Sequence, residues 1–210
     1  MFKKNCLGAL TALGLVCVAG AAHADPRTHD GFQLRLAPGL GYLSDSDSIS
    51  GGGFTSPDLS IHGIAPAFEL FVGGSLAPGL ALGGTFNFMI ASGPSASVGG
   101  QSVTASSDVK MNFFTIGPYV DYYLDPAQGF HLLGTLGFAT MNLSNNTSSS
   151  TASTGFGLGL GAGYDWWVSD EWSIGILGRF NYAHMTYSAG GATRSDNMIA
   201  PAIEFSAAFN

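Results

Sequence analysis

The sequence predicts an all-β fold, a closed eight-stranded antiparallel barrel that crosses a membrane. Three observations lead to this prediction. Residues 156–187 alternate apolar with small or polar side chains at a period of two, which is the period of a strand. Eight such stretches follow one another, most of them longer than the 5–6 residues of an average strand, and their connections alternate between long and short. Charged residues make up only 10% of the chain, against about 25% in soluble proteins.

Residues 1–24 are predicted to be an export signal. Two lysines, Lys3 and Lys4, precede an apolar run, and residues 22–24 read Ala-His-Ala, small residues where a signal peptidase cleaves. Cleavage there leaves residues 25–210 as one barrel domain. The alternative is a lipoprotein signal ending at Cys17, although a valine stands before it where a small residue is expected.

Cleavage of the signal changes both the thiol content and the charge. Cys6 and Cys17 leave with it, so the mature chain has no thiol for a disulfide, a metal site or a nucleophile. The loss of two lysines changes the net charge from −7 to −9, that is 5 basic against 14 acidic residues. This negative charge disfavours nucleic acid as a partner.

The eight strands follow a short polar leader at 25–31. They are predicted at 32–42, 60–72, 80–91, 109–124, 130–143, 156–168, 172–187 and 197–209. Each is assigned because apolar side chains occupy every second position. These outward sets run from Phe32 to Tyr42, Ile64 to Val72, Leu80 to Ile90, Phe114 to Leu124, Phe130 to Phe138, Phe156 to Val168, Trp172 to Tyr182 and Ile199 to Phe209.

Turn-forming residues separate the strands. Short turns are predicted at 73–79, 125–129 and 169–171, with Pro78-Gly79 as the strongest signal. Longer polar loops are predicted at 43–59, 92–108, 144–155 and 188–196. Outer-membrane barrels place long loops outside and short turns in the periplasm, so both termini are predicted to be periplasmic.

Strand length and aromatic placement agree with a membrane span. A strand of about 13 residues is about 43 Å long, and a tilt of about 45° leaves about 30 Å across the membrane. A periplasmic aromatic rim is predicted from Phe32, Tyr122, Phe130, Trp166, Trp172 and Phe209. A barrel of eight strands is filled by its own side chains and leaves no open pore.

In its export signal, amphipathic strands, aromatic rim and strand-final Phe209, the chain resembles the small outer-membrane barrels of the OmpA/OmpX type. The resemblance covers residues 32–210, although the family usually ends on the phenylalanine and this chain ends on Asn210. It implies a monomer in the bacterial outer membrane, in contact with outer-membrane lipid and lipopolysaccharide. It also implies that the barrel-assembly machinery recognises the C-terminal strand. A cell-wall anchoring role is not expected.

Six charged residues fall at inward positions, three to seven residues from the periplasmic ends of their strands. They are Arg35, Glu69, Asp121, Asp165, Arg179 and Glu204. One interpretation is a gate or ion path. The favoured one is a structural plug, in which the charges pair because a narrow lumen removes their water. The similar heights of Arg35 and Glu69 on adjacent strands predict that these two residues pair.

Four prolines, Pro38, Pro66, Pro118 and Pro201, fall at outward positions in the middle of strands. Proline cannot donate to a ladder and a closed barrel has no edge, so local bulges are predicted. Three of the four would lie on neighbouring strands. They form either a docking seam on the lipid side or a region of local strain.

Two further groups of polar residues have the composition of a chemical site. His184, Thr186 and Asp196 resemble the His-x-Ser pair and acid of barrel-type lipid A deacylases, with threonine in place of serine; the alternative is a tolerant polar rim. Asp45 and Asp47 lack a full calcium-loop pattern, so a solvated acidic loop is expected.

The remaining histidines, His29, His62 and His131, lack ligand spacing, and no metal or cofactor is predicted. The sequence therefore predicts a non-enzymatic outer-membrane barrel with a structural or surface-interaction role and a lumen plugged by charges. The first alternative is a small channel or transporter for minor solutes, and the second is the lipid A deacylase.

Overall fold

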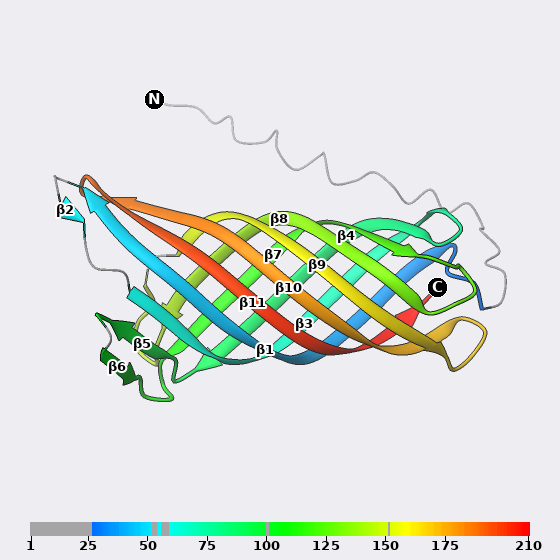
Figure 1. Ribbon diagram of the computed structural model, residues 1–210, viewed down its shortest axis with the longest axis horizontal. Helices are drawn as coiled ribbons and strands as arrows, with labels where there is room; N and C mark the ends of the chain where they lie inside the picture. Colours follow the sequence, from blue (N-terminus) through cyan, green and yellow to red (C-terminus); the bar gives the residue numbers. More distant parts are fainter. Residues whose placement is uncertain (1–26, 52–53, 56–58, 100, 151) are drawn as a thin grey trace, which may run out of the picture.

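The computed structural model describes residues 27–51, 54–55, 59–99, 101–150 and 152–210, and the predicted export signal at 1–24 lies outside them. Within this part of the chain, eight long strands form the wall of a barrel (Figure 1). They are β1 (Phe32–Gly51), β3 (Leu59–Ala77), β4 (Leu80–Ser92), β7 (Lys110–Tyr123), β8 (Phe130–Ser144), β9 (Ser153–Trp167), β10 (Trp172–Ala189) and β11 (Ala192–Phe209). Every neighbouring pair is antiparallel, and β1 pairs with both β3 and β11. The predicted fold class is confirmed. None of the described residues forms a helix long and apolar enough to cross a membrane.

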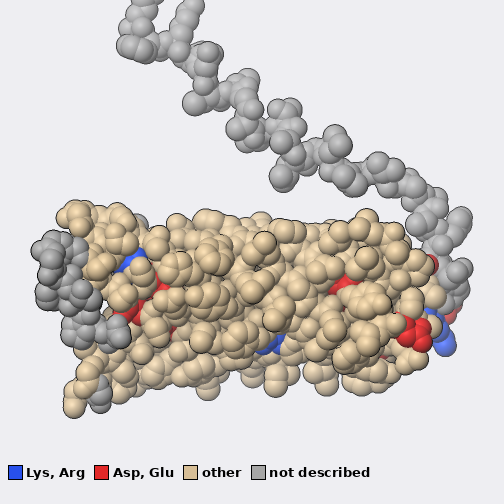
Figure 2. Space-filling model, turned by 45° about the horizontal axis from the view of Figure 1, so that its top comes forward, with Lys and Arg blue, Asp and Glu red and all other residues tan. Residues whose placement is uncertain are grey.

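The wall alternates between side chains that face the lumen and side chains that face outward, as the period of two predicted. In β1 the outward positions are apolar from Phe32 to Tyr42, and in β11 from Ile199 to Phe209. Beyond this band the outward positions become polar on every strand: Ser44, His62, Ser92, Asn112, Thr140, Thr154, His184 and Asn197. A band of about 11 residues, tilted by about 45°, is about 25 Å tall, which matches the apolar height of membrane barrels. The side wall in Figure 2 is almost free of charge, and charged side chains gather towards the two ends.

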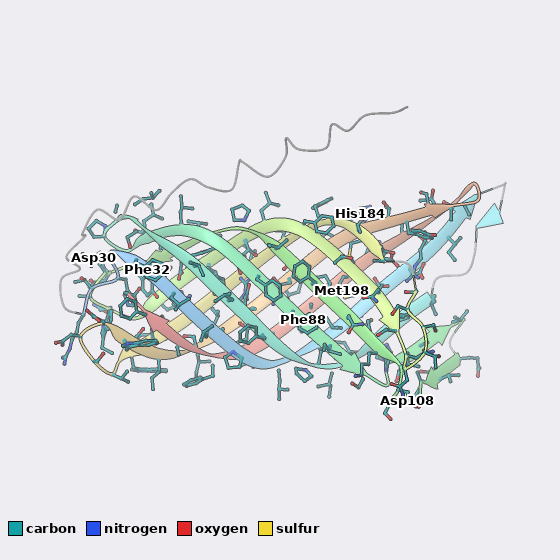
Figure 3. All side chains as sticks on the ribbon, turned by 180° about the vertical axis from the view of Figure 1, so that it is seen from behind. Asp30, Phe32, Phe88, Asp108, His184 and Met198 are labelled. Carbon is teal, nitrogen blue, oxygen red and sulfur yellow. The ribbon has the colours of Figure 1, made fainter. Side chains whose placement is uncertain are left out.

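The six residues of the predicted periplasmic rim lie at the end that holds the short turns and the C-terminus (Figure 1). Five of them, Phe32, Tyr122, Phe130, Trp166 and Trp172, are between 42% and 54% exposed. Phe209 is half-buried, with its ring centroid 5.4 Å from that of Trp172 and 6.4 Å from that of Phe32. Figure 3 marks this end by Asp30 and Phe32 and the opposite end by Asp108.

The predictions of two outer loops, at 43–59 and 188–196, are wrong because the strands of the barrel continue beyond the apolar band. β1 runs on to Gly51 where a loop from residue 43 was expected. The expected loop at 188–196 is a tight turn, in which Gly190 and Gly191 have positive φ values of 59° and 81°. Outward serines alternate here with lumen-facing residues. The period of two therefore persists, but the contrast between apolar and polar faces that marks a membrane strand is lost.

The expected loop at 92–108 holds a further hairpin, β5 (Ser95–Val98) and β6 (Gln101–Thr104). β5 pairs with the outer end of β3, so the sheet extends beyond the barrel in the order β3-β5-β6. A short strand, β2 (Phe54–Thr55), pairs with the outer end of β1. At the periplasmic end, β3 runs to Ala77 instead of ending at residue 72, with a register shift between Ser75 and Ala77.

The bulges predicted at the prolines are also wrong. Around Pro38 the β1–β11 ladder passes from Leu36↔Ala207 to Gly39↔Glu204, so rungs are missing while the register stays the same. The same pattern surrounds Pro201 in this ladder and Pro118 in the β7–β8 ladder. The β3–β4 ladder begins directly after Pro66. Each proline lacks one N–H donor, and these strands accept the missing bond without gaining a residue.

Candidate functional site

All six predicted lumen charges lie inside the barrel, and none is more than 4% exposed. They reach the lumen from β1, β3, β7, β9, β10 and β11, because each occupies an inward position of its strand. The structure brings them together in two groups, one above the other, where the sequence analysis expected one network.

The lower group is built around Arg35. Its Nη1 lies 2.8 Å from Oδ2 of Asp121, and its Nη2 lies 3.0 Å from Oδ2 of Asp165. The Arg35 guanidinium also donates to the hydroxyl of Tyr123, which donates to Asp165 over 2.8 Å. Nδ1 of His131 lies 2.7 Å from Oδ1 of Asp121. One guanidinium therefore neutralises part of a two-carboxylate site, which also receives hydrogen bonds from Tyr123 and from Ser206 and lies against His131.

The upper group is built around Arg179 and Glu69. The guanidinium donates from Nε to Oε2 over 2.9 Å and from Nη2 to Oε1 over 3.0 Å, a two-point pairing. Thr85 also donates to Glu69, and Arg179 donates to Thr135. Glu204 is 1% exposed, and within the described residues neither of its carboxylate oxygens has a hydrogen-bond partner. The six buried charges are therefore not all paired.

The predicted Arg35–Glu69 pair is wrong. In the β1–β3 register, Glu69 lies opposite Ala37, and Arg35 lies opposite Phe71. The Phe71 ring stands between the two groups, with its centroid 5.8 Å from Cζ of Arg35 and 6.0 Å from Cζ of Arg179. The prediction counted heights from residue 72, but β3 extends to Ala77, which places Glu69 further from the periplasmic end.

The leader residues Arg27 to Gly31 cross the periplasmic mouth, which the sequence analysis did not foresee. His29 is 2% exposed and stacks between Tyr123 and Trp167, with ring centroids 3.5 Å and 4.4 Å away. Burial is the main reason that the pKa of His29 is lowered to about 4, so the ring is neutral near pH 7. The inward parity of Tyr123 was visible in the sequence, but no local pattern linked it to a histidine before the first strand.

The outer half of the lumen is apolar and rich in methionine. All five methionines that follow the predicted signal are in one buried cluster, each at most 2% exposed: Met89, Met111, Met141, Met185 and Met198. Leu43, Ile61 and Phe113 complete it with several alanines. Figure 3 labels Met198 inside the barrel. Methionine is flexible and fills irregular space, so this half is packed by adaptable side chains.

Above the methionines, three aspartates share one arginine. Nε of Arg194 lies 2.8 Å from Asp47 and 2.7 Å from Asp196, and its Nη2 lies 3.8 Å from Asp45. The aspartates are at most 4% exposed, so the solvated acidic loop expected at Asp45 and Asp47 is wrong. These residues lie beyond the apolar band. Burial, and then the negative charge of Asp196, raise the pKa of Asp45 to about 7.

Within the described residues no three His, Cys, Asp or Glu side chains are arranged to hold a metal ion.

The three residues compared with a deacylase do not come together. His184 and Thr186 occupy outward positions of β10, whereas Asp196 is completely buried on the lumen side of β11. His184 instead has its Nδ1 3.0 Å from Oδ1 of Asn197, which also accepts a hydrogen bond from Tyr182. The alternation of side chains explains this result, because His184 faces outward from β10 and Asp196 faces the lumen from β11.

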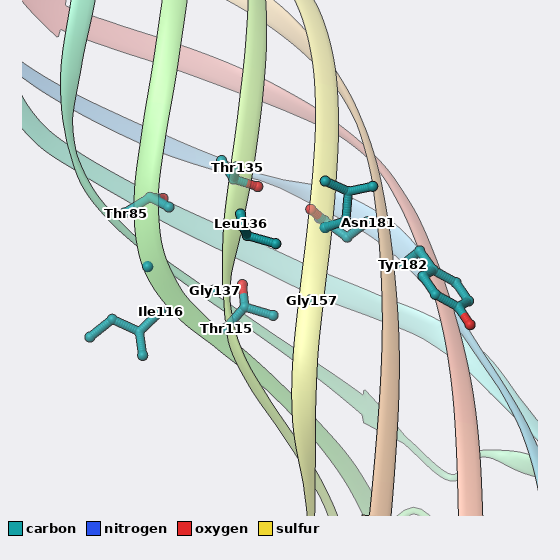
Figure 4. A pocket seen from close by; sticks show the side chains of 11 residues that line it. Thr85, Thr115, Ile116, Thr135, Leu136, Gly137, Gly157, Asn181 and Tyr182 are labelled. Carbon is teal, nitrogen blue, oxygen red and sulfur yellow. The ribbon is translucent and has the colours of Figure 1, made fainter.

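A small cavity lies beside the upper charge group (Figure 4). Its volume is about 10 Å³, and its lining includes Thr85, Thr115, Thr135 and Asn181. A volume of this size holds about one water molecule. The hydroxyl and amide groups of the lining suit such a molecule better than a solute.

Comparisons with known proteins agree with this architecture. The sequence model of a family described as the outer membrane protein beta-barrel domain matches residues 8–208. The solved structure of the outer membrane protein OprG from Pseudomonas aeruginosa is similar with a TM-score of 0.54 and 12% identity, covering 89% of this chain and 100% of that one. Neisserial surface protein A is similar with a TM-score of 0.49 and 14% identity, over 82% and 96% of the two chains. At these identities OprG shares the fold alone. No curated protein sequence matches this chain.

Proposed function

This chain belongs to the outer membrane protein beta-barrel domain family, and from that premise we propose that it is a sealed, non-enzymatic barrel with a structural or surface-interaction role. It resides in the bacterial outer membrane, where its apolar band contacts outer-membrane lipid and lipopolysaccharide. The proposal includes cleavage of the signal after Ala24, recognition of β11 by the barrel-assembly machinery, and a monomeric barrel.

The observation that supports the proposal is a succession of buried side chains along the lumen. From the periplasm outward, an axis through the barrel meets the ring of His29, the Arg35 group, the Arg179 group, the methionine cluster and the Arg194 group. Partners of opposite charge offset the cost of burying the ions. The cavity beside the Arg179 group is of the size of one water.

The surface above the membrane supports a contact role rather than chemistry. Its described connections are rich in Ser, Thr, Gly and Asn, and the deacylase residues point away from one another. Short serine and threonine side chains present hydroxyls but offer little reactivity without an adjacent base. The extended β3-β5-β6 sheet gives this surface a platform that is continuous with the barrel wall.

Conductance across a planar bilayer tests the sealed lumen. The refolded mature chain, residues 25–210, is expected to give no discrete current steps at neutral pH. The Arg179→Ala, Glu69→Ala double variant removes the central pair and is expected to leak. Leu136→Ala, which shortens an outward side chain, is the matched control and is expected to stay silent. Regular current steps in the unmodified protein would overturn the proposal.

One feature favours the runner-up, a small channel for minor solutes. Glu204 has no hydrogen-bond partner among the described residues, and the outer lumen is closed by flexible methionines rather than by rigid rings. A channel interpretation requires these side chains to move. It would replace the sealed barrel if the unmodified protein conducts and Glu204→Gln changes its preference between cations and anions.

A further inference from the structure

The β5–β6 hairpin stands outside the apolar band, at the end of the barrel opposite the C-terminus (Figure 1). It is fixed to the wall by pairing of Leu59–His62 in β3 with Ser95–Val98 in β5. Ala96 and Leu59 pack against the apolar cluster of the lumen. The hairpin is therefore a continuation of the barrel sheet, held by both backbone pairing and side-chain packing.

β6 is the last strand of this sheet, and its outer edge has no partner strand among the described residues. All four of its residues, Gln101–Thr104, are exposed. Sheet edges are normally protected by a very short edge strand, charged side chains, proline, bulges or a covering segment. β6 is short, but the sequence from Ser95 to Ala105 contains no charged residue and no proline. The edge therefore carries no charge and no proline that would oppose pairing.

The hydrogen-bond parity shows which backbone groups face the open side. The N–H of Ala105 donates to the carbonyl of Pro94, and Val98 lies opposite Gln101 across a two-residue loop. Hydrogen-bonded pairs alternate along an antiparallel ladder. Val103 therefore bonds towards β5, whereas the N–H and C=O groups of Ser102 and Thr104 point away from it.

The two faces of the hairpin differ in chemistry. One face carries a ladder of hydroxyls, with Ser95 3.0 Å from Thr104 and Ser97 donating to Ser102 over 3.1 Å. On the other face, Val98 is 45% exposed and Val103 is 70% exposed. A strand added to β6 would meet alternating hydroxyl and aliphatic neighbours, a combination that favours cross-strand pairing.

We propose that the open edge of β6 binds an extended, uncharged peptide segment of a partner protein, which adds to the sheet as a further strand. Main-chain bonds to Ser102 and Thr104 supply the affinity, and Val103 supplies an aliphatic contact. A charged segment is disfavoured because the edge carries no group to pair with it. The proposal rests on the surface-interaction role and names the kind of partner that such a surface takes.

Fluorescence anisotropy tests the edge directly. The probe is a labelled synthetic heptapeptide that alternates threonine and valine, titrated against the refolded mature chain. We expect saturable binding that changes little between low and roughly 0.5 M salt, because no charges pair. The same peptide with N-methyl groups on alternate residues keeps its side chains but loses its donors, and we expect it to bind at least about tenfold more weakly.

Two variants at one position provide the matched comparison. Ser102→Pro removes the outward N–H and is expected to weaken probe binding at least about tenfold, whereas Ser102→Ala keeps the N–H and binding. Equal binding of the methylated and unmethylated probes would overturn the proposal, as would the absence of saturation. Self-association that Ser102→Pro abolishes would overturn the partner class in favour of a second copy of the chain. If the probe does not bind and the barrel does not conduct, the edge-site proposal is wrong while the proposal of a sealed barrel is still supported.

Discussion

Most buried charges of the lumen contact a partner of opposite charge, whereas Glu204 has no hydrogen-bond partner among the described residues. Arg179 meets Glu69 through two hydrogen bonds, while Arg35 meets Asp121 and Asp165 below the Phe71 ring. Removing one member of such a pair leaves a buried charge without compensation, which costs about 3–5 kcal/mol. The coupling free energy between two substitutions therefore reports whether the two residues are partners.

We expect Arg179→Ala and Glu69→Ala each to destabilise the barrel by about 3–5 kcal/mol, because each leaves its partner unpaired. The double variant should lose less than the sum, by about 0.5–3 kcal/mol. Urea unfolding in lipid, monitored by tryptophan emission, measures the free energy of unfolding of the unmodified protein, both single variants and the double variant. Arg35→Ala combined with Glu69→Ala is the control, with a clearly smaller coupling. Equal coupling in the two cycles would contradict the observed pairing.

At the scale of elements, the leader segment Arg27 to Gly31 acts as a strap across the periplasmic mouth. Its backbone bonds reach three different turns: Arg27 N–H donates to Asp170, His29 N–H donates to Pro126, and Gly79 N–H donates to His29. The turns it joins lie between β9 and β10, β7 and β8, and β3 and β4. The strap therefore fixes the mouth from several sides, with His29 buried beneath it.

Acid should weaken this strap. The pKa of His29 is lowered from 6.5 to about 4 by burial, so between these values the unfolded chain binds a proton that the folded chain does not. The free energy of unfolding is then complete above pH 6.5 and falls as the pH drops to 4, by at most on the order of 3 kcal/mol. We expect His29→Phe, which keeps a stacked ring, to lose this contribution to the slope.

The pH dependence of the free energy of unfolding must be compared between His29→Phe and the unmodified protein. The pKa of Asp45 is raised from 3.8 to about 7, and this group contributes a slope of opposite sign, since its folded form gains a proton as the pH falls. Urea unfolding at several pH values between 4 and 7 measures the difference. An unchanged slope in His29→Phe would show that His29 is charged, or exposed, in the folded barrel.

The strands could be predicted from the sequence, because a buried lumen and an apolar exterior impose a period of two over the whole band. The inward positions of Arg35 and Glu69 follow from that period. Their partners do not, since partner choice depends on register and on where β3 ends, and Ser75 lies at a register shift. The strap could not be predicted either, because His29 is buried by contacts with residues far away in sequence.

For the molecule as a whole, the outward wall and the lumen differ in where they place charged and apolar side chains. The outward wall is apolar and meets lipid, so its charged groups lie in the lumen or near the ends (Figure 2). Inside, each ionic group is stacked against an apolar layer, first Phe71 and then the methionines. We expect this stack to close the barrel against water-borne solutes.

Thiol accessibility tests whether the lumen is closed, because residues 25–210 contain no cysteine that would react in the background. Single cysteines are introduced as Ala37→Cys in the lower lumen, Ala139→Cys in the upper lumen and Ser46→Cys on the exposed outer wall. Intact protein in lipid vesicles is treated with a charged, membrane-impermeant thiol reagent from each side. We expect rapid labelling of Ser46→Cys, with both lumen cysteines unlabelled until the barrel is unfolded. Labelling of Ala37→Cys and Ala139→Cys in the folded barrel, at the rate of Ser46→Cys, would show that the lumen is open to solutes.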